Sequence, residues 1–347
     1  MWQQSIIDTS AAFARLTRLW SGVSWPTFGA AAVSLALSAP AHAATYTTFD
    51  PPGSLTTGAQ GISAGAIVGT YYITPTVHGY LRAADGTFTT VDPSGSHGTT
   101  PFSINRRGAI AGYYFDSNSK FHGFVRHASG KIISFDAPGS GATYGLSINK
   151  VGAITGWYND SAGDHGYVRA ADGTFSTFDT NGSIGTHPWA VNDGGTATGN
   201  WYDSNLTQHG FVRTADGTDT SFDPAGSITT APLSINTGGA IAGTYQTSDF
   251  ANHGFVRAAD GTFATFDPAG SFVTVATSIN ARGQVTGYWY DSNGGEHGFV
   301  RLANGKIRNF DPPGSIQTRP ESIDDHGVIA GEYEDSNQVQ HGFSRTP

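Results

Sequence analysis

The sequence predicts an all-β protein: a seven-bladed β-propeller of four-stranded antiparallel blades, in a ring closed by an N-terminal strand that pairs with the last blade. Three observations predict it: a repeat of about 44 residues, turn residues that cut each repeat into four short strands, and incomplete repeats at the two ends of the chain. The composition agrees, because 47 Gly, 16 Pro and only 13% charged residues are typical of short strands joined by tight turns.

Three markers repeat in step along the chain. A His-Gly pair followed by Phe or Tyr begins at His78, His122, His165, His209, His253, His297 and His341. An Asp that follows Phe or Val opens a D-x-x-G-S segment at Asp50, Asp92, Asp136, Asp179, Asp223, Asp267 and Asp311. A Thr follows seven residues later, at Thr57, Thr99, Thr143, Thr186, Thr230, Thr274 and Thr318. Such a period indicates one supersecondary unit per repeat.

Turn residues divide one repeat, residues 92–136, into its strands. The expected strands are 101–105 (PFSIN), 109–115 (AIAGYYF), 122–128 (HGFVRHA) and 131–136 (KIISFD). The last turn is Ser-Gly in this repeat and Asp-Gly or Asn-Gly in others, which are favoured pairs for a two-residue hairpin. A four-stranded antiparallel meander is therefore expected in each repeat.

The two ends of the chain complement each other. Residues 45–50 (TYTTFD) resemble a fourth strand without the first three, and residues 341–347 (HGFSRTP) resemble a third strand without its fourth. Joined, they complete a blade and leave no free sheet edge. A linear β-solenoid is the alternative, but it would need capping repeats instead of complementary halves.

The repeat also resembles a known family. The pattern A/S-I-N-x-x-G-x-I-x-G-x-Y, a short loop and H-G-F are similar to the HAF-type repeats of exported bacterial proteins, over residues 45–345. The chain departs from that pattern in the Gly after each His, in Tyr80 and Tyr167 where Phe is usual, and in the D-x-x-G-S segment. The resemblance implies export and a repeat fold.

The first 43 residues have the pattern of a removable export signal. Arg15 and Arg18 precede a short apolar run, residues 28–39, and residues 41–43 (AHA) match the small-x-small site of a signal peptidase. The run is shorter than the roughly 20 residues that span a bilayer. We therefore expect cleavage after Ala43, one propeller domain over residues 44–347, no membrane span, and a periplasmic or extracellular location.

The charge and the cysteine content limit which kinds of binding partner are expected. Residues 44–347 hold 16 basic and 26 acidic residues and no basic run, which argues against nucleic acid or anionic lipid as a partner. The chain has no Cys, so the fold must close without disulfides. The loops lack the alternating acidic pattern of a calcium loop. We expect a monomer without metal or cofactor, with a glycan, small molecule or protein as ligand.

The repeated polar residues are predicted to build the scaffold. The loops that join second to third strands and fourth strands to the next repeat leave from one face, and each repeated His and Asp meet there. A His-Asp pair can relay protons and a His cluster can bind metal. Seven copies spread around a ring cannot converge on one site, however. We therefore expect His, Asp, Thr and Ser to satisfy one another, and the repeated Arg to bridge neighbouring blades.

Function is expected where equivalent positions differ. The residues after each repeated Thr begin the innermost strand, and among them stand aromatic, amide and charged side chains that do not repeat. The predicted ligand-binding residues are Gln60, Phe102, Tyr144, His187, Trp189, Arg319 and Glu321. Apolar walls with a few polar groups are how small-ligand sites are built, and aromatic faces suit a sugar. Alternatively, these side chains simply fill the central channel of the predicted ring.

Two functions from different classes remain open. The first is a non-catalytic binding or interaction module. The second is a lyase or hydrolase acting on a polysaccharide or lactone, with His187 as acid or base, Glu321 as its partner and Arg319 stabilising anionic charge. No nucleophile elbow, zinc-protease motif or phosphate loop occurs in the sequence.

Overall fold

The computed structural model describes residues 44–347, and the export signal expected in residues 1–43 lies outside the described residues. Residues Ala44–Pro347 form one compact unit whose regular elements are all β-strands. In this part of the chain no helix is long and apolar enough to cross a membrane.

Four kinds of strand alternate along the chain. The first strands are β2 (Thr56–Ser63), β6 (Gly98–Ile104), β10 (Ala142–Ile148), β14 (Gly185–Val191), β18 (Ser227–Ile235), β22 (Val273–Ile279) and β26 (Ser315–Ile323). The second strands are β3 (Ala66–Ile73), β7 (Ile110–Phe115), β11 (Ile154–Asn159), β15 (Ala197–Tyr202), β19 (Ile241–Thr247), β23 (Val285–Tyr290) and β27 (Ile329–Asp335). The third strands are β4 (Thr76–Arg82), β8 (Phe121–Arg126), β12 (Asp164–Arg169), β16 (Gln208–Arg213), β20 (Asn252–Arg257), β24 (Glu296–Arg301) and β28 (Gln340–Thr346). The fourth strands are β5 (Phe88–Thr90), β9 (Ile132–Phe135), β13 (Phe175–Phe178), β17 (Asp219–Phe222), β21 (Phe263–Phe266), β25 (Ile307–Phe310) and, from the start of the chain, β1 (Thr45–Phe49).

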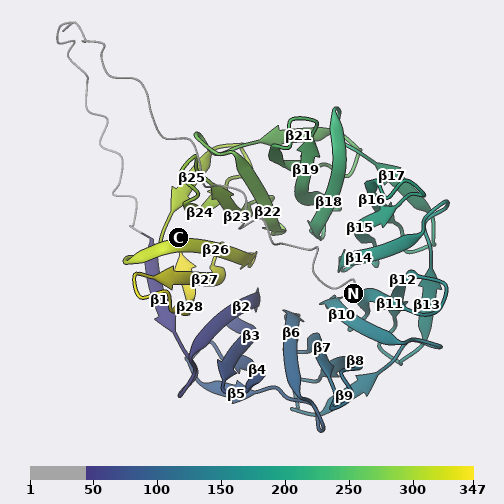
Figure 1. Ribbon diagram of the computed structural model, residues 1–347, viewed down its shortest axis with the longest axis horizontal. Coiled ribbons are helices and arrows are strands. Elements are labelled where there is room, and N and C mark those ends of the chain that lie inside the picture. Colours follow the sequence, from purple (N-terminus) through teal and green to yellow (C-terminus); the bar gives the residue numbers. More distant parts are fainter. Residues whose placement is uncertain (1–43) are drawn as a thin grey trace, which may run out of the picture. The chain divides into compact units, whose positions relative to one another are not determined.

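Successive strands pair into antiparallel meanders, as the turn residues predict. In β6 to β9, for example, each strand pairs with the next, and the first strands lie innermost in Figure 1. β1 pairs antiparallel with β28 and places Phe49 opposite Gly342. Single parallel bridges, such as Val77 to Gly98, join some third strands to the next first strand, so the meanders merge into three hydrogen-bonded sheets.

The first strands begin earlier than the sequence predicts. The strand expected at residues 101–105 starts at Gly98. The reason is a hydrogen bond that extends the inner hairpin, in which His97 N–H donates to the Phe115 carbonyl at 2.7 Å. The other three strands of this repeat lie within two residues of their predicted bounds.

The two ends of the meanders differ. One, which we call the loop face, is where the first and third strands begin, and it carries the loops 116–120 and 136–141. The opposite end, the turn face, carries tight turns such as residues 128–131, where Gly130 adopts a φ of 91°. Only glycine takes that backbone conformation without steric strain, which explains the Gly in each such turn.

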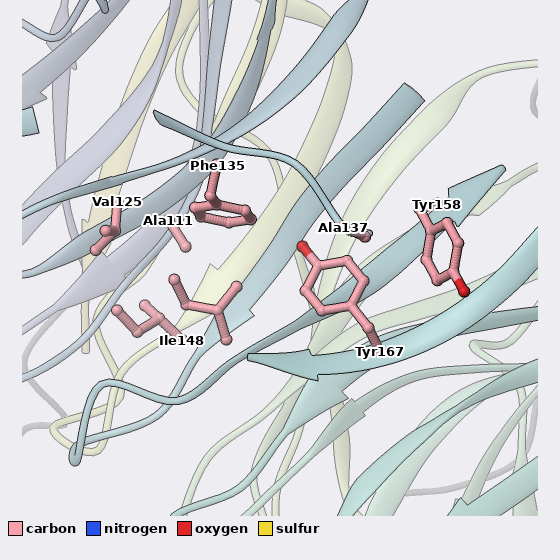
Figure 2. Close-up of a cluster of buried hydrophobic side chains, with 8 residues drawn as sticks. Ala111, Val125, Phe135, Ala137, Ile148, Tyr158 and Tyr167 are labelled. Atoms are coloured by element: carbon pink, nitrogen blue, oxygen red, sulfur yellow. The ribbon is translucent and has the colours of Figure 1, made fainter. Parts of the chain in front are cut away.

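The hydrophobic core lies between consecutive meanders instead of at one centre. In the cluster of Figure 2, Ala111, Val125 and Phe135 of one meander pack against Ile148 and Tyr167 of the next. The aromatic residue after each repeated His-Gly is almost fully buried, at Tyr80, Phe124, Tyr167, Phe211, Phe255, Phe299 and Phe343. Each meander thus covers an apolar face of its neighbour, as repeat proteins require.

Polar side chains join the inner ends of the meanders. The buried Asn105 Nδ2 donates to the carbonyl of Asn149 at 2.8 Å, and the same bond recurs from Asn149, Asn192, Asn236 and Asn280 to the next repeat. Ser oxygens accept backbone N–H groups across the same interfaces, including Ile62 N–H to Ser322 at 3.3 Å between the first and last meanders. Buried polar groups are satisfied in pairs, so each repeat fixes the register of the next.

The pairing of β1 with β28 can be tested at Gly342. A Cβ added there would overlap the buried Phe49 ring, so we expect Gly342→Ala to lower the free energy of unfolding by about 1–3 kcal/mol through overpacking. Gly185→Ala is the matched control, because the nearest atoms to its added Cβ lie 3.7 Å away. Denaturant unfolding measures both; equal stability of the two variants would contradict the packing of β1 on β28.

Candidate functional site

The seven repeated His side chains are held by the seven repeated Asp side chains. Each His Nδ1 lies 2.7–2.9 Å from an Asp oxygen, across the third and fourth strands. Each His ring also lies against a Tyr or Trp of the second strand, at centroid distances of 4.7–5.3 Å. An Asp at Nδ1 and an aromatic ring at the equivalent position in every copy agree with the interpretation that these pairs build the scaffold.

The repeated Arg side chains bridge neighbouring meanders. In six repeats the guanidinium lies over the Phe that ends the fourth strand of the preceding repeat, 4.2–5.0 Å from the ring centroid. The seventh, Arg126, has Val91 at the position of that Phe. Desolvation lowers the pKa of Arg169, Arg257 and Arg301 from the ordinary value, which is consistent with stacking in place of hydration.

The non-repeated side chains occupy cross-strand pairs of the inner hairpins. In the register of the first and second strands, Tyr144 lies opposite Trp157, His187 opposite Asn200, and Arg319 opposite Glu332. The residue before each repeated His also varies and includes Asp164 and Glu296. These positions contact one another across neighbouring meanders and form two clusters, one aromatic and one charged.

The aromatic cluster is centred on His187 of β14. Its ring lies 4.6 Å from Trp157 and 5.5 Å from Tyr202, and Trp157 stacks on Tyr144 at 4.1 Å. Tyr144 in turn contacts Phe121, at 5.1 Å. Three successive meanders thus contribute one stack of rings near the loop face. Burial raises the pKa of Tyr144 to about 12, so its hydroxyl stays protonated as a hydrogen-bond donor.

His187 is 6% exposed and hydrogen-bonded at only one nitrogen. Its Nε2 lies 2.9 Å from Asp164 Oδ2, whereas Nδ1 is buried without a hydrogen-bond partner among the described residues. Asn200, opposite it and 2% exposed, accepts from Trp189 Nε1 at 2.7 Å, and its Nδ2 has no partner in full hydrogen-bond geometry among the described residues, although burial raises the pKa of Tyr202 and the nearby Asn200 side chain opposes this rise. Two buried polar side chains that lie opposite each other therefore each retain a hydrogen-bonding atom without a partner among the described residues.

The Tyr that replaces Phe in one repeat supports this cluster. Tyr167 OH donates to the carbonyl of Tyr144 at 2.9 Å, so this departure from the repeat fixes the inner strand that carries the stacked ring.

The charged cluster is centred on Arg319 of β26. Its Nε donates to Glu296 Oε1 at 2.7 Å, and one terminal nitrogen reaches both Glu296 Oε2 at 3.1 Å and Tyr290 OH at 3.2 Å. The guanidinium also lies 4.9 Å from the centroid of the Tyr288 ring. Although burial opposes it, the hydrogen bond and charge of Glu296, which is itself buried, raise the pKa of Arg319 above its usual range.

Two further carboxyl groups lie beside this pair. Burial and the nearby Glu332 raise the pKa of Glu321 to about 8, and burial raises the pKa of Glu332 to about 7. Glu332 reaches Gly58 of the first meander, since its Oε2 lies 2.5 Å from the position that a Cβ on that glycine would take, and Gln60 lies beside the same glycine. One Arg thus faces three carboxyl groups; near pH 7 Glu321 favours the neutral form and Glu332 is divided between its two forms.

The structure divides the predicted binding residues. Tyr144, His187 and Trp189 belong to the aromatic cluster, while Gln60, Arg319 and Glu321 belong to the charged one. Phe102 lies on β6, between the strands that carry the two clusters.

The catalytic combination of His187, Arg319 and Glu321 stays a prediction. The hydrogen-bond partners of His187 and Arg319 are Asp164 and Glu296, and within residues 44–347 no hydrogen bond or ion pair joins His187 to Arg319 or Glu321. No group of three His, Cys, Asp or Glu residues in the same range is arranged to hold a metal ion.

Sequence reasoning missed Trp157, Asn200, Asp164, Glu296 and Glu332. The sequence does contain a signal for them, because they also differ between repeats. Trp157, Asn200 and Glu332 each follow the Gly of the I-x-G-x-Y pattern or its variants. Asp164 and Glu296 each precede a repeated His. Finding them required the same comparison of repeats at two more positions.

A separate hollow of about 200 Å³ lies at the turn face. Its walls include the repeated Asn105, Asn149 and Asn192 and the Ile or Val that precedes each of them. Because nearly equivalent residues recur around it, the scaffold itself explains this hollow.

Comparisons with known proteins identify a fold but no family. No family model and no curated protein matches the chain. The chain is similar to a catalytically inactive variant of virginiamycin B lyase from Staphylococcus aureus with quinupristin, at 15% identity and a TM-score of 0.56, covering 88% of this chain and 100% of that one. It is also similar to the β-propeller domain of the Trilobed protease from Pyrococcus furiosus, which has an open velcro topology, at 9% identity, a TM-score of 0.63 and coverage of 84% and 95%. An oligogalacturonate lyase from Vibrio parahaemolyticus matches at 11% identity, a TM-score of 0.59 and coverage of 87% and 96%. The described chain therefore has a β-propeller fold, and at such identities the likeness extends to the fold alone.

The carboxyl groups of the charged cluster predict how stability depends on pH. Because the pKa of Glu321 rises from 4.5 to about 8 on folding, the folded state holds this proton where the unfolded chain has lost it. The free energy of unfolding should therefore fall as pH rises from about 4.5 to about 8. Glu321→Gln should remove much of this fall. Above pH 8 the free energy of unfolding of this variant should exceed that of the wild type by at least about 1 kcal/mol. Denaturant unfolding across this pH range measures the effect.

Glu334→Gln is the control, since it removes one carboxylate from β27, the strand that pairs with β26, at a position opposite Gln317 and outside the charged cluster, and should leave the slope unchanged. A Glu321→Gln variant that keeps the full wild-type slope would contradict the burial of a protonated Glu321.

Proposed function

We propose that the chain is an exported, non-catalytic binding module whose small polar or glycan ligand is held at the aromatic cluster. The observation that carries the proposal is the pair of unused atoms, His187 Nδ1 and Asn200 Nδ2, buried beside the stacked rings of Tyr144 and Trp157. A ligand with both a hydrogen-bond donor and an acceptor would satisfy them after a small shift of the rings. Sugars have such groups and an apolar face that suits aromatic walls.

The scaffold of this proposal is a seven-bladed propeller in a ring closed by β1. Closure is supported by the pairing of β1 with β28, which completes the last meander, and by two contacts that join the first meander to the last, Ile62 N–H to Ser322 and Arg82 over Phe49. The resemblance to HAF-type repeats and the pattern of residues 1–43 support export to the periplasm or beyond the cell. A rigid ring would hold the variable side chains in fixed positions.

The charged cluster favours a second candidate function, a lyase or hydrolase acting on a polysaccharide or lactone. A carboxyl group with a pKa of about 8 or 7, such as Glu321 or Glu332, can donate a proton at neutral pH, and the adjacent Arg319 can stabilise a developing anion. In this scheme Glu321 is the acid or base, and His187 belongs to substrate binding. Turnover of a polysaccharide or lactone library that survives Glu321→Gln and Glu332→Gln would exclude these roles.

A binding screen tests the leading proposal. Glycans and small metabolites are screened by the shift in melting temperature and by tryptophan fluorescence, and each hit is titrated against Trp157→Leu and His187→Ala. We expect both variants to weaken binding at least about tenfold, because each removes part of the cluster, which corresponds to about 1.4 kcal/mol.

Trp201→Leu is the matched control. Trp201 stacks on the repeated His209 at 4.7 Å and belongs to the scaffold, so its loss should leave the affinity unchanged. A ligand that binds both cluster variants with wild-type affinity would refute the site.

A further inference from the structure

Large apolar side chains stand at one equivalent position in five repeats. Leu55, Ile184, Ile228, Phe272 and Ile316, which we call the apolar rim, are 54%, 51%, 38%, 47% and 49% exposed. Each follows the D-x-x-G-S segment, at or next to the start of a first strand, so all lie at the loop face. His97 and Gly141 occupy this position in the other two repeats, next to the aromatic cluster. Scattered exposed apolar residues are ordinary, but a set repeated around one face marks an interaction surface.

Two loops extend the apolar surface. Leu206 and Phe250 are 69% and 68% exposed, and both adopt a positive φ, of 64° and 65°. Ser119 and Gln338 adopt the same conformation at the equivalent positions, which shows that the turn itself does not need an apolar residue. The apolar side chains there therefore serve something other than the fold.

The loop face is also strongly acidic. The seven repeated Asp residues lie there, together with the loop residues Asp116, Asp160, Asp203, Asp249, Asp291 and Asp335. Among the described residues, the Lys and Arg on this face are Lys120 and Arg319, and Arg319 is bound to Glu296. Arg308 lies within the fourth strand β25, and the other basic residues lie at the ends of the third strands or in the turns of the opposite face, such as Arg107 and Lys150. The loop face thus combines apolar side chains with negative charge.

We infer that the loop face docks a cationic amphipathic polypeptide segment. Its apolar side chains would cover the apolar rim, and its Lys and Arg would lie against the loop aspartates, a charge complementarity that raises the association rate and selects the partner. An anionic membrane fits poorly because the face would repel it. The loop face of a second copy of this chain also fits poorly, because it carries the same negative charge. This docking is independent of the ligand site at the aromatic cluster.

The test uses a synthetic Leu/Lys amphipathic helix as probe. Fluorescence anisotropy of the labelled peptide is measured at pH 7.5 with residues 44–347, the compact unit, in parallel with a Leu/Glu peptide of the same pattern. We expect binding of the Leu/Lys peptide only, weakened by added salt and at least about tenfold weaker in the triple variant Ile184→Ser, Ile228→Ser, Phe272→Ser. Val151→Ser is the matched control, because Val151 is 50% exposed on the turn face.

Three results would overturn the inference. These are equal binding of the Leu/Glu peptide, wild-type affinity in the triple variant with unchanged melting temperature, and flotation of the protein with phosphatidylglycerol vesicles. A fourth such result comes from sedimentation velocity of the unlabelled protein. Self-association that the triple variant abolishes would assign the apolar rim to contact between copies of this chain and would also overturn the inference. Loss of small-ligand binding in the cluster variants is measured separately, so failure of one proposal leaves the other testable.

Discussion

The interface between successive meanders is the constraint on which the rest of the structure depends. A single four-stranded meander cannot bury both of its faces, so each covers the next, with Arg over Phe at the outer strands and Asn and Ser hydrogen bonds at the inner ones. The residues that build this interface must recur in every repeat. Side chains that the interface does not use, at the inner hairpins and on the loops, are the ones free to vary.

This constraint separates scaffold from candidate site. The repeated His and Asp pair with each other in every copy, and their number reflects the number of meanders instead of chemistry. His187, in contrast, has Asp164 as its partner and lies between Trp157 and Tyr202, an environment that no other repeat reproduces. Arg319 with Glu296 is a second environment of this kind, where desolvation and neighbouring carboxylates perturb the ionisation of Glu321 and Glu332.

The sequence was sufficient to predict the strands and to identify some residues of the aromatic and the charged cluster. Gly and Asp-Gly turns locate the hairpins, and the hairpin register brings each repeated His to its Asp. The start of β6 was misplaced because the hydrogen bond from His97 N–H to Phe115 leaves no trace in residue type. The partners Trp157 and Glu332 were missed because a register shift between Gly145 and Ser147, repeated in the other inner hairpins, hides which side chains lie opposite one another. Glu296 was missed because it lies on the third strand, directly before the repeated His, and reaches Arg319 only across neighbouring meanders.

We propose that the scaffold repeats so that a few non-repeated inner side chains can hold a ligand. The most direct measurement is a crystal structure of protein purified from its native source. The account predicts electron density for a bound molecule within hydrogen-bonding distance of His187 Nδ1 and Asn200 Nδ2. Density confined to the hollow at the turn face, or inner rings that close on one another with no bound molecule, would contradict it.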